Sequence, residues 1–150
     1  MITMTIDKPH MNMINQTLKA LPVKVQRNGM RKVMRRFTAA IRNKARTNAP
    51  VRTKRLRKSI TNKVSIRYSS GVITGRVLVD SSKHGVHYGH LLEWGTPPHG
   101  KHPGNAGTRY MTRAFEELGT QEDFRGFFVP TMAEEFRKLG IKVPFGFDKL

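Results

Sequence analysis

The fold of this chain is decided by residues 28–48, NGMRKVMRRFTAAIRNKARTN. Apolar side chains recur along this stretch at a period of about 3.6 residues, which predicts a helix with one buried face: Met30, Val33, Met34, Phe37, Ile41 and Ala45. A separate stripe of arginines lies about 130 degrees around the same helix: Arg31, Arg35, Arg42 and Arg46. Pro50 ends the helix because its ring pushes Ala49 out of the helical region. The sequence therefore predicts a long helix that buries one side and presents guanidinium groups on another.

Two features precede this helix. Residues 1–12 show neither a helical face nor strand alternation, and we interpret them as a mobile arm. Four residues then follow at helical spacing: Ile14, Thr17, Leu18 and Leu21. Pro22 suits the first turn of the next helix, where its missing N–H would have no partner. The N-terminal part is therefore predicted to form a pair of helices.

Strand patterns follow the long helix. Residues 61–68 alternate apolar and polar side chains, residues 69–71 supply turn chemistry, and residues 72–79 read as a second strand. Because a two-stranded hairpin is marginal in water, a further strand or the long helix must cover its apolar face. Residues 86–94 fit either a third strand or a helical turn, and their pattern does not decide between them.

The C-terminal part is predicted to be helical. Residues 97–107 have no periodicity and are interpreted as an exposed loop. A helix with Tyr110 and Ala114 on its apolar side ends at Gly119, and Thr120 with Asp123 resembles a capping box that starts another helix. That last helix has a dense phenylalanine face, with Pro130 as a kink or break.

The predicted fold class is α+β. It consists of an N-terminal helix pair with one long basic helix, a small and mainly antiparallel β-sheet, and two C-terminal helices. These elements form a single domain over residues 13–140. Residues 141–150 make an apolar tail that we expect to dock on its own subunit or on another.

The charge of the chain is concentrated in its first half. The formal net charge is +18 over 150 residues, yet residues 8–79 contain no Asp or Glu and carry nineteen of the 28 Lys and Arg residues. Residues 80–150 hold nine basic and nine acidic residues. The positive charges of residues 8–79, which form an acid-free block, repel one another in a compact fold and need an anionic neighbour, such as nucleic acid, an acidic protein or an anionic membrane surface.

We expect this block to contact a phosphate backbone or an acidic partner. No acid within it can pair along the helix with the cations, and aromatic side chains suited to base stacking are sparse there. The residues assigned to this contact are Arg31, Arg35, Arg42, Arg46, Arg52, Lys54, Arg55, Arg57 and Lys58.

The composition disfavours several classes of protein. The absence of cysteine excludes a disulfide scaffold, a thiolate zinc site and thiol catalysis, and fits a reducing cytoplasm. We expect no cleaved export signal, because residues 1–10 show no basic region followed by an apolar run. We expect no membrane span, because no run of about 18 apolar residues occurs. We therefore expect no membrane partner.

An enzymatic role has little support in the sequence. Five of the six histidines lie between His84 and His102, but His84, His87 and His90 share a face only on a helix, which Gly85 and Gly89 disfavour. No paired acids for two-metal chemistry, nucleophile elbow or phosphate-binding glycine loop is found. We expect no enzyme activity, no metal and no cofactor.

Two stretches carry a more specific pattern. PVRTKRLRKSI, residues 50–60, follows the long helix, and YGHLLEWGTPP, residues 88–98, follows the hairpin. This order resembles the tail-completion or head–tail joining proteins of long-tailed bacteriophages. In that family a helix ending in Ala-Pro leads to Thr-Gly-x-Leu-x-x-Ser, then to Tyr-Ala-x-x-x-Glu-aromatic-Gly-Thr and to a Pro-Phe-Leu-x-x-Ala helix start.

The resemblance covers roughly residues 18–118. Matching positions are Ala49, Pro50, Thr53, Leu56, Ser59, Tyr88, Glu93, Trp94, Gly95, Thr96 and Ala114. Three departures stand out: Lys54 replaces the glycine of the first motif, Gly89 replaces the alanine of the second, and RYM at residues 109–111 replaces Pro-Phe-Leu.

The resemblance implies a structural protein of the virion neck, assembled in the host cytoplasm. It would form an oligomeric ring that completes the tail or joins head to tail. Its partners would be further copies of itself, neighbouring connector, terminator or tail-tube proteins, and genomic DNA in the channel. The residues assigned to the subunit interface are Tyr88, Glu93, Trp94, Gly95, Thr96, Phe145 and Phe147.

The second motif also leads to local predictions. Gly95 would allow a positive φ after Trp94. Glu93 would form an ion pair with Arg55 or Arg57, within the subunit or across an interface; alternatively, Glu93 is exposed and Trp94 is buried.

The sequence is also compatible with two other functions. The first is a free nucleic-acid-binding protein that contacts the phosphate backbone, which the acid-free block favours. The second is a small metal-dependent nuclease that uses the histidines of residues 84–102, which we rank last.

Overall fold

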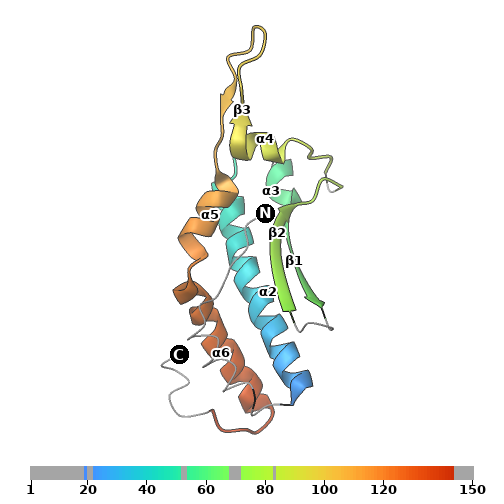
Figure 1. Ribbon diagram of the computed structural model, residues 1–150, viewed down its shortest axis with the longest axis vertical. Helices are drawn as coiled ribbons and strands as arrows, with labels where there is room; N and C mark the ends of the chain where they lie inside the picture. The colour runs from blue at the N-terminus through green and yellow to red at the C-terminus, as the bar shows by residue number, and fades with distance from the viewer. Residues whose placement is uncertain (1–18, 20–21, 52–53, 68–71, 83, 144–150) are drawn as a thin grey trace. The chain divides into compact units, whose positions relative to one another are not determined.

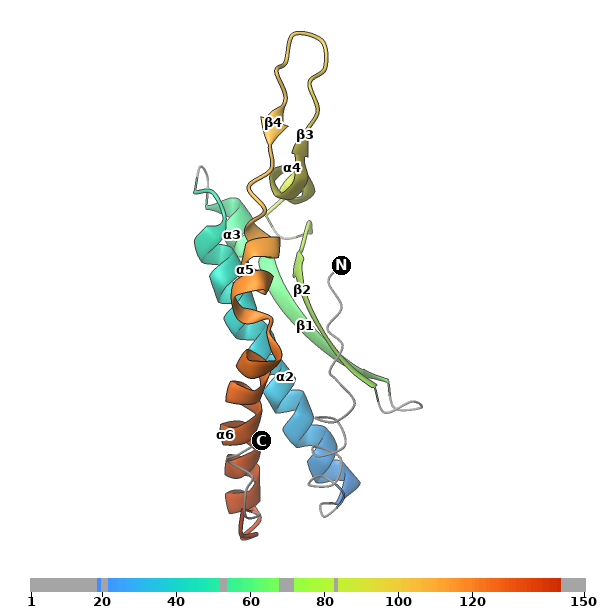
Figure 2. The same cartoon turned by 60° about the vertical axis from the view of Figure 1, so that its left-hand side comes forward.

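The computed structural model describes residues 19, 22–51, 54–67, 72–82 and 84–143 (Figure 1, Figure 2). The chain divides into two compact units. The first unit comprises the described parts of residues 1–37, 64–75 and 120–150, and the second comprises those of residues 38–63 and 76–119. The predicted arm of residues 1–12, the first helix of the N-terminal pair and the tail from residue 144 onwards lie outside the described residues.

The long helix α2 spans Val23–Asn48 and contributes to both units. It begins directly after Pro22, whose carbonyl accepts hydrogen bonds from the backbone N–H groups of Val25 and Gln26. The predicted apolar face is buried, with Val33, Phe37, Ile41 and Ala45 each at most 1 % exposed. The predicted long helix is therefore confirmed, as is the α+β fold class.

The core of the first unit lies between α2 and α6 (Gln121–Lys138). Phe37 packs edge-on against Phe124 at a ring-centroid distance of 5.4 Å and lies 5.9 Å from Phe127. Phe128 and Phe136 are also buried. The phenylalanine face predicted for the last helix is thus the surface that packs against the first half of α2.

Helix α6 begins with the predicted capping box. The Thr120 hydroxyl accepts a hydrogen bond from the Asp123 N–H at 3.1 Å, and the Asp123 carboxylate accepts one from the Thr120 N–H at 3.2 Å. Pro130 does not break this helix, which continues to Lys138. Buried side chains on both sides of the proline, including Phe128 and Met132, anchor the helix to the core and offset the lost backbone hydrogen bond.

Ion pairs join α2 to α6 along the edge of this core. Lys32 lies 3.0 Å from Glu134 and 2.9 Å from Glu135, and Arg36 forms two 3.0 Å hydrogen bonds to Glu134. The acid-free block is therefore neutralised in part by glutamates that lie about a hundred residues later in the chain.

The second unit contains the start of the β1–β2 hairpin, formed by Ile60–Arg67 and Val72–Val79. The Asp80 N–H, just after β2, donates to the carbonyl of Ser59, just before β1, so the strands are antiparallel. Arg42 and Asn62 join the helix to this hairpin: Arg42 donates to the Asn62 side chain at 2.9 Å, and Asn62 donates to Thr38 at 3.0 Å. Among the described residues, the long helix contacts the hairpin at this point and no third strand pairs with it.

Residues 86–94, which the sequence left undecided, contain the short helix α4 (Gly89–Trp94). Helix α5 (Tyr110–Leu118) follows and lies beside the second half of α2 (Figure 1), where Lys44 pairs with Glu117. Between α4 and α5, strands β3 (Gly95–Thr96) and β4 (Asn105–Ala106) form a narrow antiparallel hairpin. Residues 97–107, predicted as an exposed loop, therefore contain strand β4. In the described part of the chain, no helix is long and apolar enough to cross a membrane.

The Glu134 ion pairs predict a pH-dependent stability. Hydrogen bonds from Arg36 and Lys32 lower the pKa of Glu134 from 4.5 to about 2. A carboxylate with a lowered pKa stabilises the fold above its unfolded value, and this stabilisation is lost as the pH falls from about 4.5 to about 2. Glu134→Gln should lower the melting temperature at pH 7 by only a few degrees, because the ion pairs are partly exposed. Near pH 2 the substitution should leave the melting temperature unchanged. Thermal melts followed by circular dichroism measure both values.

Glu116→Gln is the matched control, because its contact with Arg109 is 3.5 Å long and both side chains are more than half exposed. A loss at Glu134→Gln that persists unchanged at pH 2 would contradict the role given to the ion pairs.

Candidate functional site

The short helix α3 (Arg55–Ser59) builds one wall of a basic groove in the second unit. Lys54 precedes the helix in the left-handed conformation, with a φ of 56°. Leu56 is 2 % exposed and anchors the helix in the core, and the buried Ser59 hydroxyl donates to the Leu56 carbonyl at 2.7 Å. The first sequence motif is thus explained by a left-handed turn, an apolar anchor and a hydroxyl that closes the turn.

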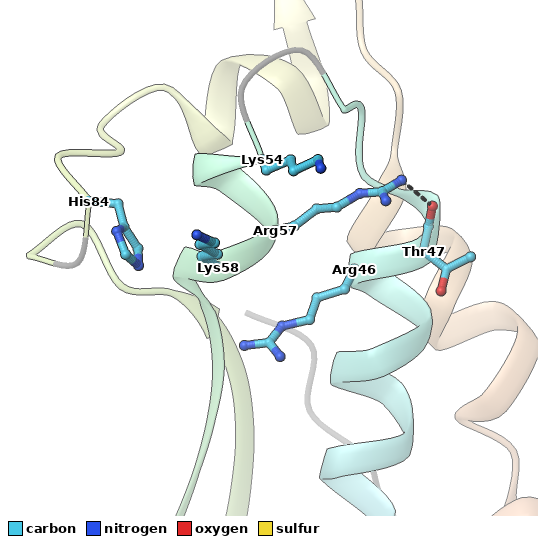
Figure 3. Close-up of a pocket in the computed structure, with 6 residues that line it drawn as sticks. All are labelled: Arg46, Thr47, Lys54, Arg57, Lys58 and His84. Carbon is cyan, nitrogen blue, oxygen red and sulfur yellow. Dashed lines mark hydrogen bonds between the residues drawn. The ribbon is translucent and has the colours of Figure 1, made fainter.

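The groove lies between α3 and the C-terminal end of α2 and has a volume of about 620 Å³. Figure 3 shows Arg46 reaching from α2 towards α3, and Arg57 reaching from α3 back to the end of α2. The lining residues are Arg46, Thr47, Lys54, Arg57, Lys58 and His84. Four lining side chains are cations and none is acidic, so the groove carries a positive charge.

Two arginines of the groove also hold it together. Arg46 donates to the Ile60 carbonyl from Nε at 3.1 Å and from Nη2 at 2.7 Å. Arg57 donates to the Ala49 carbonyl from Nε at 3.1 Å and from Nη2 at 3.0 Å. Ala49 lies just after the end of α2 and Ile60 is the first residue of β1, so these bonds hold the helix end and the start of the strand at the groove. Desolvation, together with the positive charge of Arg42, lowers the pKa of Arg46.

The other cations assigned to an anionic partner do not join this groove. Arg31 lies farther along α2, with its Nε buried and without a hydrogen-bond partner among the described residues. Arg35 and Arg55 are exposed, Arg42 binds the side chains of Asn43 and Asn62, and Arg52 lies outside the described residues. The structure therefore brings together four of the nine predicted residues: Arg46, Lys54, Arg57 and Lys58.

The second motif forms α4 and the root of the β3–β4 hairpin. Glu93 is only 6 % exposed, whereas Trp94 is 71 % exposed. The alternative of an exposed glutamate beside a buried tryptophan is therefore wrong. Glu93 is therefore enclosed within the chain, whereas the Trp94 side chain is accessible to solvent.

Glu93 caps helix α5. Its carboxylate accepts hydrogen bonds from the backbone N–H of Met111 at 2.9 Å, from the backbone N–H of Thr112 at 2.9 Å and from the Thr112 hydroxyl at 2.6 Å. The predicted ion pair within the subunit between Glu93 and Arg55 or Arg57 is wrong, because Glu93 binds the N-terminus of α5 and Arg57 binds the end of α2. A carboxylate at this end of a helix is favoured by the unsatisfied N–H groups and by the helix dipole.

The hairpin root requires glycine. Gly95 has a φ of 85° and a ψ of −179°, a region that is essentially restricted to glycine, so the predicted positive φ is confirmed. A Cβ atom at Gly95 would collide with the backbone carbonyl of Asn105, and one at Gly107 would collide with that of Glu93. The backbone segments around these two glycines can approach this closely only because neither glycine carries a side chain.

The remaining residues of the predicted interface differ in exposure. Tyr88 is 36 % exposed, Gly95 and Thr96 are half-buried in the hairpin root, and Phe145 and Phe147 lie outside the described residues.

Among the histidines of residues 84–102, His99 and His102 pair across the hairpin with stacked rings whose centroids are 5.6 Å apart. Within the described residues, no group of three His, Asp or Glu side chains could hold a metal ion.

A family model of bacteriophage proteins matches residues 13–95, more than half of the chain. Its description is "Bacteriophage HK97-gp10, putative tail-component". The chain belongs to this family. The match includes the whole groove and the second motif as far as Gly95, so the predicted resemblance to a phage tail protein is confirmed. Searches of curated proteins and of solved structures found no match.

Removing the Glu93 cap should destabilise this phage tail component. Glu93→Ala deletes three hydrogen bonds to a buried carboxylate and should lower the free energy of unfolding by about 3 kcal/mol. Thr112→Val keeps the backbone hydrogen bond and should cost about 1 kcal/mol. Urea unfolding followed by circular dichroism measures both changes. Equal losses for the two variants would show that the backbone contacts of Glu93 contribute nothing.

Proposed function

We propose that this tail component is a structural subunit of the virion neck that assembles into a closed ring, where it completes the tail or joins it to the head. Family membership supports a structural role in the tail. The observation that carries the ring is the exposure of Trp94, at 71 %, at the root of the β3–β4 hairpin. Large exposed aromatic side chains are enriched at protein interfaces, where their burial supplies much of the binding energy.

The hairpin has the construction of an assembly element. In both views it projects away from α4 and α5, the helices that flank it in the chain (Figure 1, Figure 2). Each of its strands is only two residues long, and both residues of the second strand are exposed. A hairpin of this size has little stability of its own in water. A neighbouring subunit would cover both the tryptophan and the strands.

Cyclic symmetry is the arrangement that suits such a surface. A projecting hairpin that enters a different surface of the next subunit makes a head-to-tail contact. Head-to-tail contacts close into a ring when the rotation between subunits closes, and otherwise grow into filaments. A ring of copies at the junction of head and tail would fulfil the structural role without any catalytic group.

Native mass spectrometry at micromolar concentration tests the ring. We expect a closed oligomer of defined copy number, alone or with neck partners, and a shift towards monomer for Trp94→Ser. Val23→Ser is the matched control, since Val23 is 57 % exposed but lies at the start of α2, far from the hairpin in the sequence. A monomer under every condition, with and without neck proteins, would refute the ring.

A further inference from the structure

We propose that the basic groove between α3 and the end of α2 binds the phosphodiester backbone of duplex DNA. The groove is open, and four of its six lining side chains are Arg or Lys. None of the lining residues is acidic, so no internal partner within the lining competes with a phosphate group. This inference does not depend on the ring, because a single subunit contains the whole groove.

The two arginines of the groove are oriented for phosphate. Each anchors its guanidinium group through Nε and Nη2, Arg46 on the Ile60 carbonyl and Arg57 on the Ala49 carbonyl. In the hydrogen bonds described for them, neither uses Nη1, which leaves N–H donors on a side chain that is already held in place. An ordered donor loses less conformational entropy when it binds a phosphate oxygen.

Backbone strain is concentrated at the same groove. Among the described residues, three non-glycine residues have a positive φ: Lys54, His84 and Arg109. Two of these, Lys54 at 56° and His84 at 62°, line the groove. A side chain in this region costs energy that glycine would not. Strained residues of this kind collect at functional sites, where they place a group that the site needs.

Lys54 and Lys58 present their ammonium groups on the same side of α3. They are four residues apart, and the Lys58 N–H donates to the Lys54 carbonyl at 3.2 Å, so one helical turn separates them. Both are exposed. Flexible, strongly hydrated ammonium groups and fixed guanidinium groups in one groove match a polyanion that presents several phosphates in sequence.

The lining favours DNA over an acidic protein segment. Protein interfaces depend on apolar and aromatic anchors in pockets, and the groove has no apolar or aromatic lining residue apart from the imidazole of His84. Phosphate contacts need only donors and positive charge. Single-stranded nucleic acid would require stacking platforms, so a duplex is the better match. Desolvation and then the positive charge of Arg42 lower the pKa of Arg46, and a bound anion would offset the repulsion between the two arginines.

Fluorescence anisotropy with a labelled duplex of mixed sequence tests the groove. The variant Lys54→Gln/Lys58→Gln removes two charges from it, and Lys63→Gln/Lys101→Gln removes two exposed charges outside it. Each lost phosphate contact should lower the slope of log affinity against log salt by about 0.9, so the groove variant should lose about two units of slope. The control variant should keep the slope of the parent protein.

Equal slopes for the two variants would overturn the proposal, because binding would then follow net charge alone. A poly-glutamate peptide supplies the third comparison. If it binds more tightly than DNA at equal salt, and the groove variant loses this binding, the partner is an acidic protein and the DNA proposal is wrong. Binding of DNA in preference to poly-glutamate, with the expected loss of slope, supports it.

The variant Lys54→Gly separates a loss of DNA binding from a loss of fold stability. Glycine relieves the left-handed strain, so this variant should melt a few degrees above the parent protein, while its DNA affinity falls and its salt slope decreases by about one. A loss of binding in a more stable protein cannot come from unfolding. Unchanged DNA binding by Lys54→Gly would show that the strained lysine does not serve the groove.

Discussion

The structure depends on the burial of one apolar face of α2. Val33 and Phe37 enter the core of the first unit, and Ile41 and Ala45 enter that of the second, each at most 1 % exposed. Full burial of a valine, isoleucine or phenylalanine side chain contributes about 1.5–3 kcal/mol, so one helix supplies central core residues to both units. The prolines at 22 and 50 flank the helix and limit its length. Among the described residues, each remaining helix or strand contacts α2 directly or through other elements.

The cations of the first half serve three different purposes. Lys32 and Arg36 pair with glutamates of α6, which joins two helices that are distant in the sequence. Arg46 and Arg57 donate to backbone carbonyls and so act as structural side chains as well as charges. Lys54 and other exposed cations are those that we propose for contact with an external anion. A high net charge therefore does not by itself define a binding surface; the position of each cation relative to carbonyls and acids does.

The sequence predicts those features of the fold that depend on local periodicity or local capping. The long helix, the β1–β2 hairpin and the Thr120 capping box are of this kind, because neighbouring residues determine them. Glu93 illustrates what local patterns miss. Its partners lie eighteen and nineteen residues later, and its burial follows from where α5 packs and not from its own neighbours. Likewise, the sequence assigns nine cations to a contact, but only the return of α3 against α2 brings four of them into one groove.

The positions where this chain departs from the family pattern coincide with unusual local geometry. Lys54 and Arg109 both have a positive φ, and a proline cannot adopt the φ of 50° found at residue 109. At Gly89, a Cβ atom would lie 3.1 Å from the methyl groups of Val79 and 3.3 Å from the Tyr110 hydroxyl, which itself donates to the Gly89 carbonyl. An alanine at 89 would therefore require Val79 and Tyr110 to shift by a few tenths of an ångström. These two departures are complementary: the glycine leaves room for the hydroxyl, and the hydroxyl donates to the carbonyl of the buried Gly89.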